Sequence, residues 1–515
     1  MAKLSTFLST ILTQISKKAL SLALNPWQNR SMSTTRALAW NTGVQIFGKV
    51  VSTAIGVMVV GLMTRYLGQE GFGLYSTANA FFQVFAIILD LGLNVMLVQM
   101  LGERAGDRAF EDRAVSATFT LRVITAFILL SVAPVIAFFL PYPTLLKVAI
   151  FAIWGSFFFS ALNQIVIGVQ QRHLKMHIVA IAEVTGRITL LAGLFLAMWA
   201  GWGLVPIVGI VSLGGFMNFA VNTLIARRYA SFRWNWDPTF WKELLRRAWP
   251  IGVSILFNLI YFKADTLILS FVRPYAEVGV YSAAYRVLEI LITLPFMYCG
   301  VLLPLLAKSW ADKNHEHFRS LLAHSYIAMA MIVAPMVAGV IVLGSRVMIA
   351  VAGADFAQSG DILKILVIAV AIIFVGTVSS HAIVALDVQR RMMPVYIGTA
   401  VLILAGYLIF IPAYGMWAAA WLTVLSESIV ALASSLISLR ASGTKILWLP
   451  ILKCILAAVV MGFAVYPLKD FWLPLPIFTG AAVYAVLVLL SGAIDKETLR
   501  ELTSFRKGAP TADVI

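Results

Sequence analysis

Charged residues are scarce in this chain. Only 12% of its 515 residues are Asp, Glu, Lys or Arg, whereas 61% are hydrophobic. A soluble globular protein carries roughly 25% charged residues, so this composition excludes a chain that is soluble over most of its length. Alternating apolar and polar patterns are also missing. The apolar runs are long and continuous, which excludes a transmembrane β-barrel.

Cysteines and catalytic motifs are rare as well. The two cysteines, Cys299 and Cys454, lie in apolar runs, so we expect neither a disulfide framework nor a metal cluster. His173 and His177 are four residues apart, but no third ligand accompanies them in the sequence. A phosphate-binding glycine loop and a nucleophile elbow are missing too. We therefore expect no enzyme, no metal and no cofactor.

Long apolar runs, in contrast, are abundant. About 20 mostly apolar residues cross a bilayer as one helix. Fourteen runs of this kind can be identified, at residues 43–63, 74–100, 115–140, 145–168, 176–199, 204–225, 249–271, 279–306, 324–343, 362–386, 393–411, 415–437, 449–467 and 474–491. We expect an all-α polytopic membrane protein with 14 transmembrane helices, called spans 1 to 14 below.

Lysine and arginine are distributed unevenly between the two ends of these spans. With the N-terminus in the cytoplasm, the inner segments hold 28 of them and the outer loops hold six. This bias follows the positive-inside rule. We therefore expect a cytoplasmic N-terminal segment at 1–42, a cytoplasmic linker at 226–248 and a cytoplasmic tail at 492–515. The net charge of +16 is then a topological signal and predicts no nucleic-acid partner.

Two inner segments have patterns of their own. Residues 1–24 carry apolar side chains along one helical side, which fits an amphipathic surface helix or an unstructured tail. The linker 226–248 is rich in arginine and tryptophan. A regulatory site is one interpretation of the linker. We favour an interfacial segment, with tryptophan at headgroup level and arginine against anionic lipid.

A short motif recurs at the starts of spans 2 and 8. Gly73-Leu74-Tyr75-Ser76 and Gly279-Val280-Tyr281-Ser282 match at an offset of 206 residues. Chance recurrence is the alternative, but the two motifs also match in topological position. We expect two parallel six-helix lobes, an N-lobe at 43–225 and a C-lobe at 249–437, with the binding site between them. Residues 438–491 then hold two extra helices.

Polar side chains inside the spans are candidates for function, because they are costly in a bilayer. In spans 1 and 2 they recur mainly at steps of four, which places each set on one helix face. A polar face cannot point at lipid, so we expect it to line a watery cavity. The candidate substrate and ion pathway consists of Asn41, Gln45, Lys49, Asn79, Gln83, Asp90, Asn258, Asp265, Arg286 and Glu289.

Other charged residues in the spans leave alternatives open. Glu183 and Arg187 have the spacing of an ion pair within one helix, and a structural role is favoured for them. Arg122 and Lys263 lie near span ends and could extend toward the headgroups. His381 suits a proton relay or a simple hydrogen bond. Asp90 is the nearest acidic partner for Lys49 by sequence.

The opening of the chain resembles a known family. The motifs are Asn41-Thr42-Gly43, the run from Thr64-Arg65-Tyr66-Leu67-Gly68 through Gly71-Phe72-Gly73-Leu74-Tyr75, Asp90-Leu91-Gly92-Leu93, and Gly353-Ala354-Asp355-Phe356. They are similar to those of the polysaccharide-exporter and O-antigen flippase family. This family belongs to the multidrug/oligosaccharidyl-lipid/polysaccharide superfamily. The resemblance extends from about residue 37 to 490 and separates the chain from the drug-extruding branch.

The resemblance implies two lobes around a hydrated cavity and a bacterial inner-membrane location. The implied substrate is a polyprenyl-diphosphate oligosaccharide, moved by alternating access coupled to an ion gradient or the membrane potential. Lys49 and Arg286 would face the diphosphate, Asp90 and Asp265 a coupling cation, and a polysaccharide polymerase and export machinery would be partners. Arg65, Gly68, Gly71 and Gly73 would be turn and hinge residues. A multidrug exporter and a membrane-embedded polymerase or ligase are the alternatives.

Overall fold

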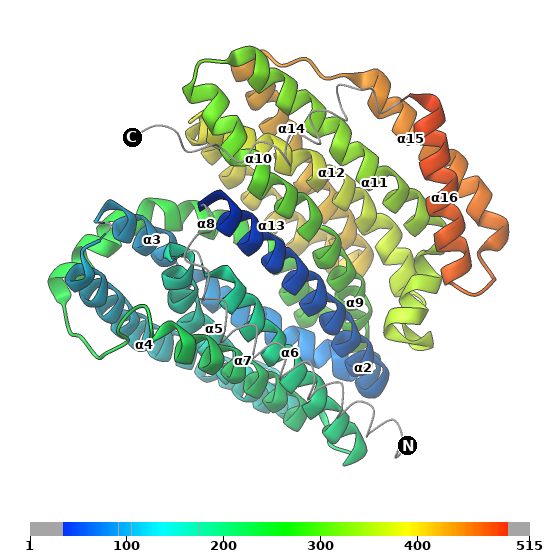
Figure 1. Cartoon of the computed structure of the whole chain (residues 1–515). Helices are drawn as coiled ribbons and strands as arrows, with labels where there is room; N and C mark the ends of the chain where they lie inside the picture. The colour runs from blue at the N-terminus through cyan, green and yellow to red at the C-terminus, as the bar shows by residue number, and fades with distance from the viewer. Residues whose placement is uncertain (1–33, 91, 105, 174, 493–515) are drawn as a thin grey trace.

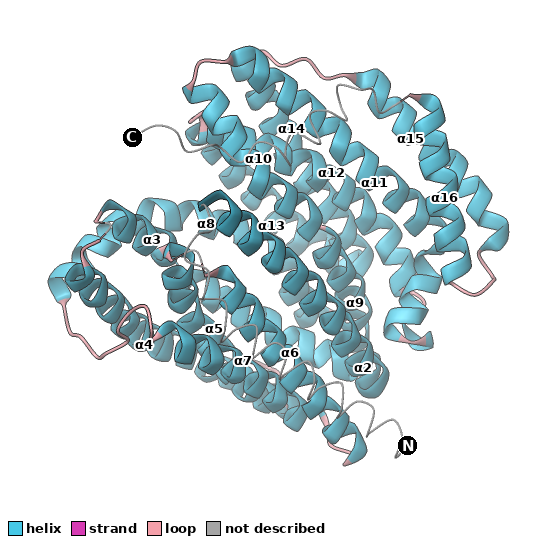
Figure 2. Cartoon of the chain, viewed as in Figure 1, coloured by secondary structure: helices cyan, strands magenta, loops and turns pink. Residues whose placement is uncertain are grey.

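The computed structural model describes residues 34–90, 92–104, 106–173 and 175–492, with side chains left out at 34–47 and 250–263. The pattern at 1–24 and the tail at 493–515 lie outside these residues. Within the described ranges the regular structure is helical throughout, joined by short loops (Figure 2).

The helices follow one another along the chain with few interruptions. The first half contains α2 (Thr34–Asp90), α3 (Leu93–Glu103), α4 (Arg108–Phe139), α5 (Thr144–Arg172), α6 (Met176–Trp199) and α7 (Leu204–Ala226). The second half contains α8 (Pro238–Val272), α9 (Tyr275–Leu291), α10 (Thr293–Ala311), α11 (His315–Ala352), α12 (Ser359–Ala385), α13 (Met393–Tyr414) and α14 (Met416–Ser442). Two more helices, α15 (Trp448–Val465) and α16 (Pro474–Ser491), complete the described chain.

Each expected span coincides with a helical stretch. By length and apolar composition, 12 continuous stretches qualify as membrane spans. The first of them, Gly48–Glu103, contains span 2 and span 1 from residue 48 onward, and α8 covers span 7. The expected all-α polytopic fold with 14 transmembrane helices is thereby confirmed.

Two glycines divide the first long stretch. Gly68 has φ 66° and ψ −175°, a backbone conformation that favours glycine, and it separates spans 1 and 2. Gly92 has φ 72° and stands between α2 and α3. Span 2, expected as one helix over 74–100, is therefore broken in its inner half. Span 8 is similarly divided between α9 and α10, at Ile292.

The helices form two bundles (Figure 1). In this view α3 to α7 make up the lower bundle, and α9 to α14 belong to the upper one. The dark blue α2 runs between them, and it packs against α5 and α6 on one side and against α8 and α9 on the other. Helix α15 packs on α11, with Tyr484 of α16 donating to the carbonyl of Met331 at 3.0 Å.

The two bundles meet at the end formed by the expected outer loops. Arg65 donates to the backbone carbonyls of Ile349 and Ala350. Tyr142 stacks on Phe271 with ring centroids 5.2 Å apart. These contacts connect the loops that the charge bias assigns to one side of the membrane.

The expected inner segments contact one another at the opposite end. His173 lies 2.7 Å from Glu111, and Arg319 donates to the carbonyl of Ser442 at 2.8 Å. The partition of the loops into two groups, predicted from lysine and arginine counts, thus agrees with the contacts of the folded chain.

Helix α8 belongs to both bundles. Its first turns pack against α3 and α4, with Phe240 and Leu244 in a core shared with Leu97. Asp237 caps the helix by accepting from the Phe240 N–H and pairs with Arg113 at 2.6 Å. That ion pair lowers the pKa of Asp237 below its ordinary value. The segment 226–248, expected as a linker, is therefore helical from Pro238 onward and continuous with span 7.

The recurring motif lies where the bundles meet. A methyl group on Gly73 would overlap the carbonyl oxygen of Tyr275, and one on Gly279 would overlap the carbonyl oxygen of Gln69. Gln69 and Tyr275 are themselves 206 residues apart, as are the two glycines. Shifting each residue of one contact by 206 positions therefore gives the other contact. Parallel halves that are related by a two-fold axis require this relation.

Candidate functional site

The candidate pathway residues lie on the helices at the boundary between the bundles. Lys49, Asn79, Gln83 and Asp90 are on α2, Asp265 is on α8, and Arg286 and Glu289 are on α9. These three helices pack against one another where the halves of the chain meet. Asn41 and Gln45 of α2 and Asn258 of α8 lie outside the residues whose side chains are described.

Lys49 pairs with Glu183 and not with Asp90. Its ammonium lies 3.2 Å from Glu183 Oε1 of α6. Ser52, three residues further along α2, donates to the same oxygen at 2.8 Å. The expected partner was wrong, because proximity in sequence does not decide which helix α2 packs against. Glu183 also does not form the expected pair with Arg187, since its ion pair crosses to Lys49.

A polar cavity of about 410 Å³ lies behind this pair inside the N-lobe. It is bounded by α5, α6 and α7, and its polar lining consists of Ser156, Ser160, Asn163, Gln164, Glu183, Arg187 and Asn218. Asn222 donates to Asn163 at 2.7 Å next to it. Such a polar lining can hold water around the carboxylate of Glu183. This water would reduce the free-energy cost of a charge inside a span.

Asp90 stands at the break in span 2 and pairs with Arg122 of α4. The guanidinium lies 3.0 Å from Asp90 Oδ1 and donates to the carbonyl of Leu89 at 2.7 Å. Arg122 is only 1% exposed, so the alternative in which it extends to the headgroups is wrong. Its guanidinium instead donates to a backbone carbonyl at the end of α2. The break at Gly92 would otherwise leave this carbonyl without a hydrogen-bond partner.

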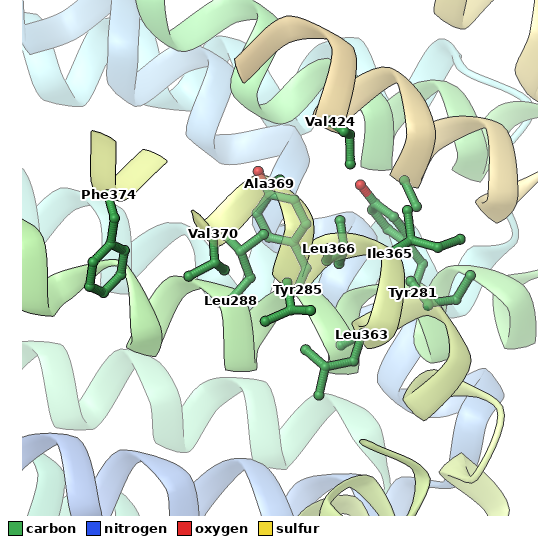
Figure 3. Close-up of a cluster of buried hydrophobic side chains, with 14 of the residues drawn as sticks. Tyr281, Tyr285, Leu288, Leu363, Ile365, Leu366, Ala369, Val370, Phe374 and Val424 are labelled. Carbon is green, nitrogen blue, oxygen red and sulfur yellow. The ribbon is translucent and has the colours of Figure 1, made fainter. Parts of the chain in front are cut away.

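Asp265 is buried within the C-lobe. Its side chain is 1% exposed and accepts hydrogen bonds from Tyr281 of α9 and from the Thr266 hydroxyl. Figure 3 shows the surrounding core, in which Tyr281 and Tyr285 lie among apolar side chains of α12. A fully buried carboxylate is rare in proteins, and this one is hydrogen-bonded to hydroxyl groups.

Arg286 and Glu289 form a pair on α9, one turn apart. Arg286 Nη1 lies 2.8 Å from Glu289 Oε2, and the two side chains are 30% and 25% exposed. Asn79 and Gln83 of α2 are also partly exposed. The structure thus pairs Lys49, Asp90 and Arg286 with opposite charges and leaves the amides of α2 partly exposed beside them.

The residues expected at the hinge lie between spans 1 and 2. Arg65 forms the contacts with α11 described above. Gly68 is the kink itself. Gly71 falls in the first turn after the kink, where a methyl group would lie 3.0 Å from the Leu67 Cβ. Gly73 is the close approach to α9.

Three further residues complete the site. Glu183 neutralises Lys49, and Arg122 neutralises Asp90. Tyr281 donates a hydrogen bond to Asp265. Glu183 and Arg122 could be identified in the sequence as charges inside spans, but their partners could not. His173, half of the possible metal pair, contacts Glu111. Among the described residues no group of three or more His, Cys, Asp or Glu could hold a metal ion.

Two helical bundles that meet at their expected outer ends define the class of this polytopic membrane-protein fold. The fold is similar to that of "Lipid II flippase MurJ, inward closed conformation", with a TM-score of 0.73, 17% identity, and coverage of 86% of this chain and 97% of that chain. It is also similar to an outward-facing "multidrug resistance MATE family transporter of the MOP superfamily", with a TM-score of 0.58, 15% identity, and coverage of 79% and 96%.

A third solved structure extends this comparison. It is a MOP superfamily transporter from Pyrococcus furiosus, with a TM-score of 0.58, 14% identity, and coverage of 79% of this chain and 96% of that chain. At these identities the likeness concerns the fold. Among curated proteins, none matches the sequence significantly.

The family follows from the sequence itself. Residues 38–310 match the family described as "Polysaccharide biosynthesis protein", and this match covers more than half of the chain. The chain belongs to that family. The family resemblance stated from the motifs at the start of the chain is confirmed to this extent.

Proposed function

We propose that the protein is a flippase that moves polyprenyl-diphosphate-linked oligosaccharides across a bacterial inner membrane, for O-antigen, capsule or exopolysaccharide synthesis. The observation that carries this proposal is the set of partly exposed charges on the boundary helices. Lys49 and Asp90 are 45% and 44% exposed, although both lie inside predicted spans. Charges at such positions favour a water-filled space between the lobes over contact with lipid.

The chemistry of the substrate fits these side chains. A diphosphate forms its strongest hydrogen bonds with cationic donors, and Lys49 and Arg286 can supply them. Asn79 and Gln83 can bind sugar hydroxyls. Because Lys49 is already paired with Glu183, the diphosphate would have to exchange with a carboxylate. Binding by exchange keeps affinity moderate, which suits a carrier that must release its cargo.

The contacts between the lobes suggest how access could alternate. The lobes are joined through Arg65, Gly73 and Tyr142 at the expected outer end, so this conformation would admit substrate from the cytoplasmic leaflet. Breaking these contacts and closing the inner end would expose the cargo to the other side.

Coupling to a cation gradient or to the membrane potential would act through the acids. A cation that binds Glu183 would release Lys49 for the diphosphate. Asp90 and Asp265 are further candidates to bind the coupling cation. In this proposal the protein is a carrier and not an enzyme. Both termini lie in the cytoplasm, and a polymerase on the outer side consumes the product.

Accumulation of precursor in cells tests the proposal. Cells depleted of the protein should accumulate lipid-linked oligosaccharide whose sugars a periplasmic labelling reagent cannot reach. Restoring the wild-type chain should make the sugars accessible. Accumulation of fully accessible precursor would instead indicate a polymerase or ligase. Unchanged precursor, together with sensitivity to organic cations, would indicate a multidrug exporter.

A further inference from the structure

The linker between the lobes contributes to an arginine-rich pocket that the transport proposal does not use. The pocket has a volume of about 460 Å³ and lies between the start of α4 and residues 227–233. Four arginines line it, namely Arg108, Arg227, Arg228 and Arg233. They come from two segments more than 100 residues apart in sequence, so the fold assembles the cluster.

These arginines have no carboxylate partner among the described residues. The two acids of the pocket contact other groups. Glu111 contacts His173 at 2.7 Å, and Asp112 accepts from the backbone N–H of Ser231 at 2.7 Å. Four guanidinium groups against two carboxylates leave the pocket with an excess of positive charge, which favours an anionic ligand. The pocket is therefore suited to a multiply bonding anion such as a phosphate.

The surroundings place the pocket at a membrane surface. Trp234 and Trp236 follow directly after Arg233, and their side chains are 65% and 63% exposed. Exposed tryptophan beside arginine is typical of the headgroup layer of a bilayer. Exposed indoles beside the pocket favour the phosphate of a lipid over a soluble phosphate ester.

We propose that the pocket formed by Arg108, Arg227, Arg228 and Arg233 binds the phosphate headgroup of an anionic phospholipid. None of the residues that line the pocket belongs to the candidate substrate and ion pathway, so the site is independent of the proposed transport function. It would hold the inner end of the N-lobe at headgroup level.

Lipid-dependent thermal stability of the delipidated, purified full-length protein tests this site. The probes are short-chain phosphatidylglycerol, phosphatidylcholine with the same chains, and inorganic phosphate. Phosphatidylglycerol should raise the melting temperature and the other two should not. In the variant R227Q/R228Q/R233Q the apparent affinity for phosphatidylglycerol should fall on the order of 100-fold, because each basic residue near a surface contributes roughly 1 kcal/mol.

A matched variant controls for charge. R390Q/R391Q/R440Q removes three exposed arginines from other expected inner segments and should respond like the wild type. If the triple pocket variant does not fold, R108Q on the other wall should weaken binding about fivefold by the same reasoning. An unchanged response of the pocket variants would overturn the proposal. Equal stabilisation by inorganic phosphate would assign the pocket to a soluble phosphate instead.

Discussion

Gly73 and Gly279 face each other where the two lobes meet, and neither position has room for a side chain. A Cβ on Gly73 would lie 3.0 Å from the Gly279 nitrogen, and a Cβ on Gly279 would lie 3.1 Å from the Gly73 nitrogen. These two distances are nearly equal, and the two glycines are 206 residues apart. The two-fold axis that relates the halves therefore passes close to this contact. The contact also lets the backbones of α2 and α9 approach as closely as small residues allow in membranes.

Gly73→Ala and Gly279→Ala should therefore each weaken the contact between the lobes. Each methyl group would meet backbone atoms that cannot move aside, at a cost of about 1–3 kcal/mol. We expect a lower melting temperature and reduced transport at normal insertion levels. Gly300→Ala and Gly339→Ala, on α10 and α11 with open space around them, are the controls and should be neutral or slightly stabilising. Similar behaviour of all four variants would contradict the close contact.

Lys49 should be required for transport. Loss of a charged hydrogen-bond donor to the diphosphate costs roughly 1.5–3 kcal/mol, so Lys49→Ala should lower the transport rate by about 10- to 100-fold. Lys49→Arg should retain part of it. The measurement is the initial rate of transport, with each variant first shown to insert at the wild-type level.

Exchange of the paired charges separates a structural from a substrate-binding role of Lys49. The variant Lys49→Glu/Glu183→Lys exchanges the two partners of the ion pair and moves the cation from α2 to α6. If Lys49 only neutralises Glu183, the exchanged protein should transport normally. If it binds the diphosphate, the exchange should restore stability and leave transport impaired. Full transport by a well-inserted Lys49→Ala protein would show that the assignment is wrong.

Arg122 should be required for stability. Arg122→Met would leave the Leu89 carbonyl without its donor and Asp90 without its cation, at a cost of about 2–4 kcal/mol. The thermal midpoint in detergent should fall accordingly. The control Arg113→Met breaks a pair whose arginine is exposed on the surface, and it should lower the thermal midpoint much less than Arg122→Met. Equal effects of the two variants would refute the special role of Arg122.

Much of this architecture could be predicted from the sequence, because a bilayer imposes strict conditions on it. Length and apolarity identify the spans, and the recurrence of Gly73 and Gly279 identifies the halves. The pairings could not be predicted. Lys49 and Glu183 are 134 residues apart, and only the packing of α2 on α6 brings them together. The break at Gly92 was missed because a single glycine in an apolar run is also tolerated within a helix.

The orientation in the membrane remains a prediction of the charge bias. Reporter fusions after residues 240 and 505 should be cytoplasmic, and fusions after residues 70 and 355 should be periplasmic. The physical reason is the excess of lysine and arginine in the segments expected inside, 28 against six. A periplasmic reporter after residue 505 would contradict the expected orientation of both termini.

Translocation of the lipid-linked substrate by the purified protein is the most direct test of the proposed function. Proteoliposomes that contain the full chain and a labelled polyprenyl-diphosphate oligosaccharide would be probed with a membrane-impermeant, sugar-modifying reagent. The account predicts that the wild-type protein makes the inner-leaflet pool accessible, and that a well-inserted Lys49→Ala variant does so at least about tenfold more slowly. An inner-leaflet pool that stays protected with the wild-type protein, under an imposed ion gradient and membrane potential, would contradict it.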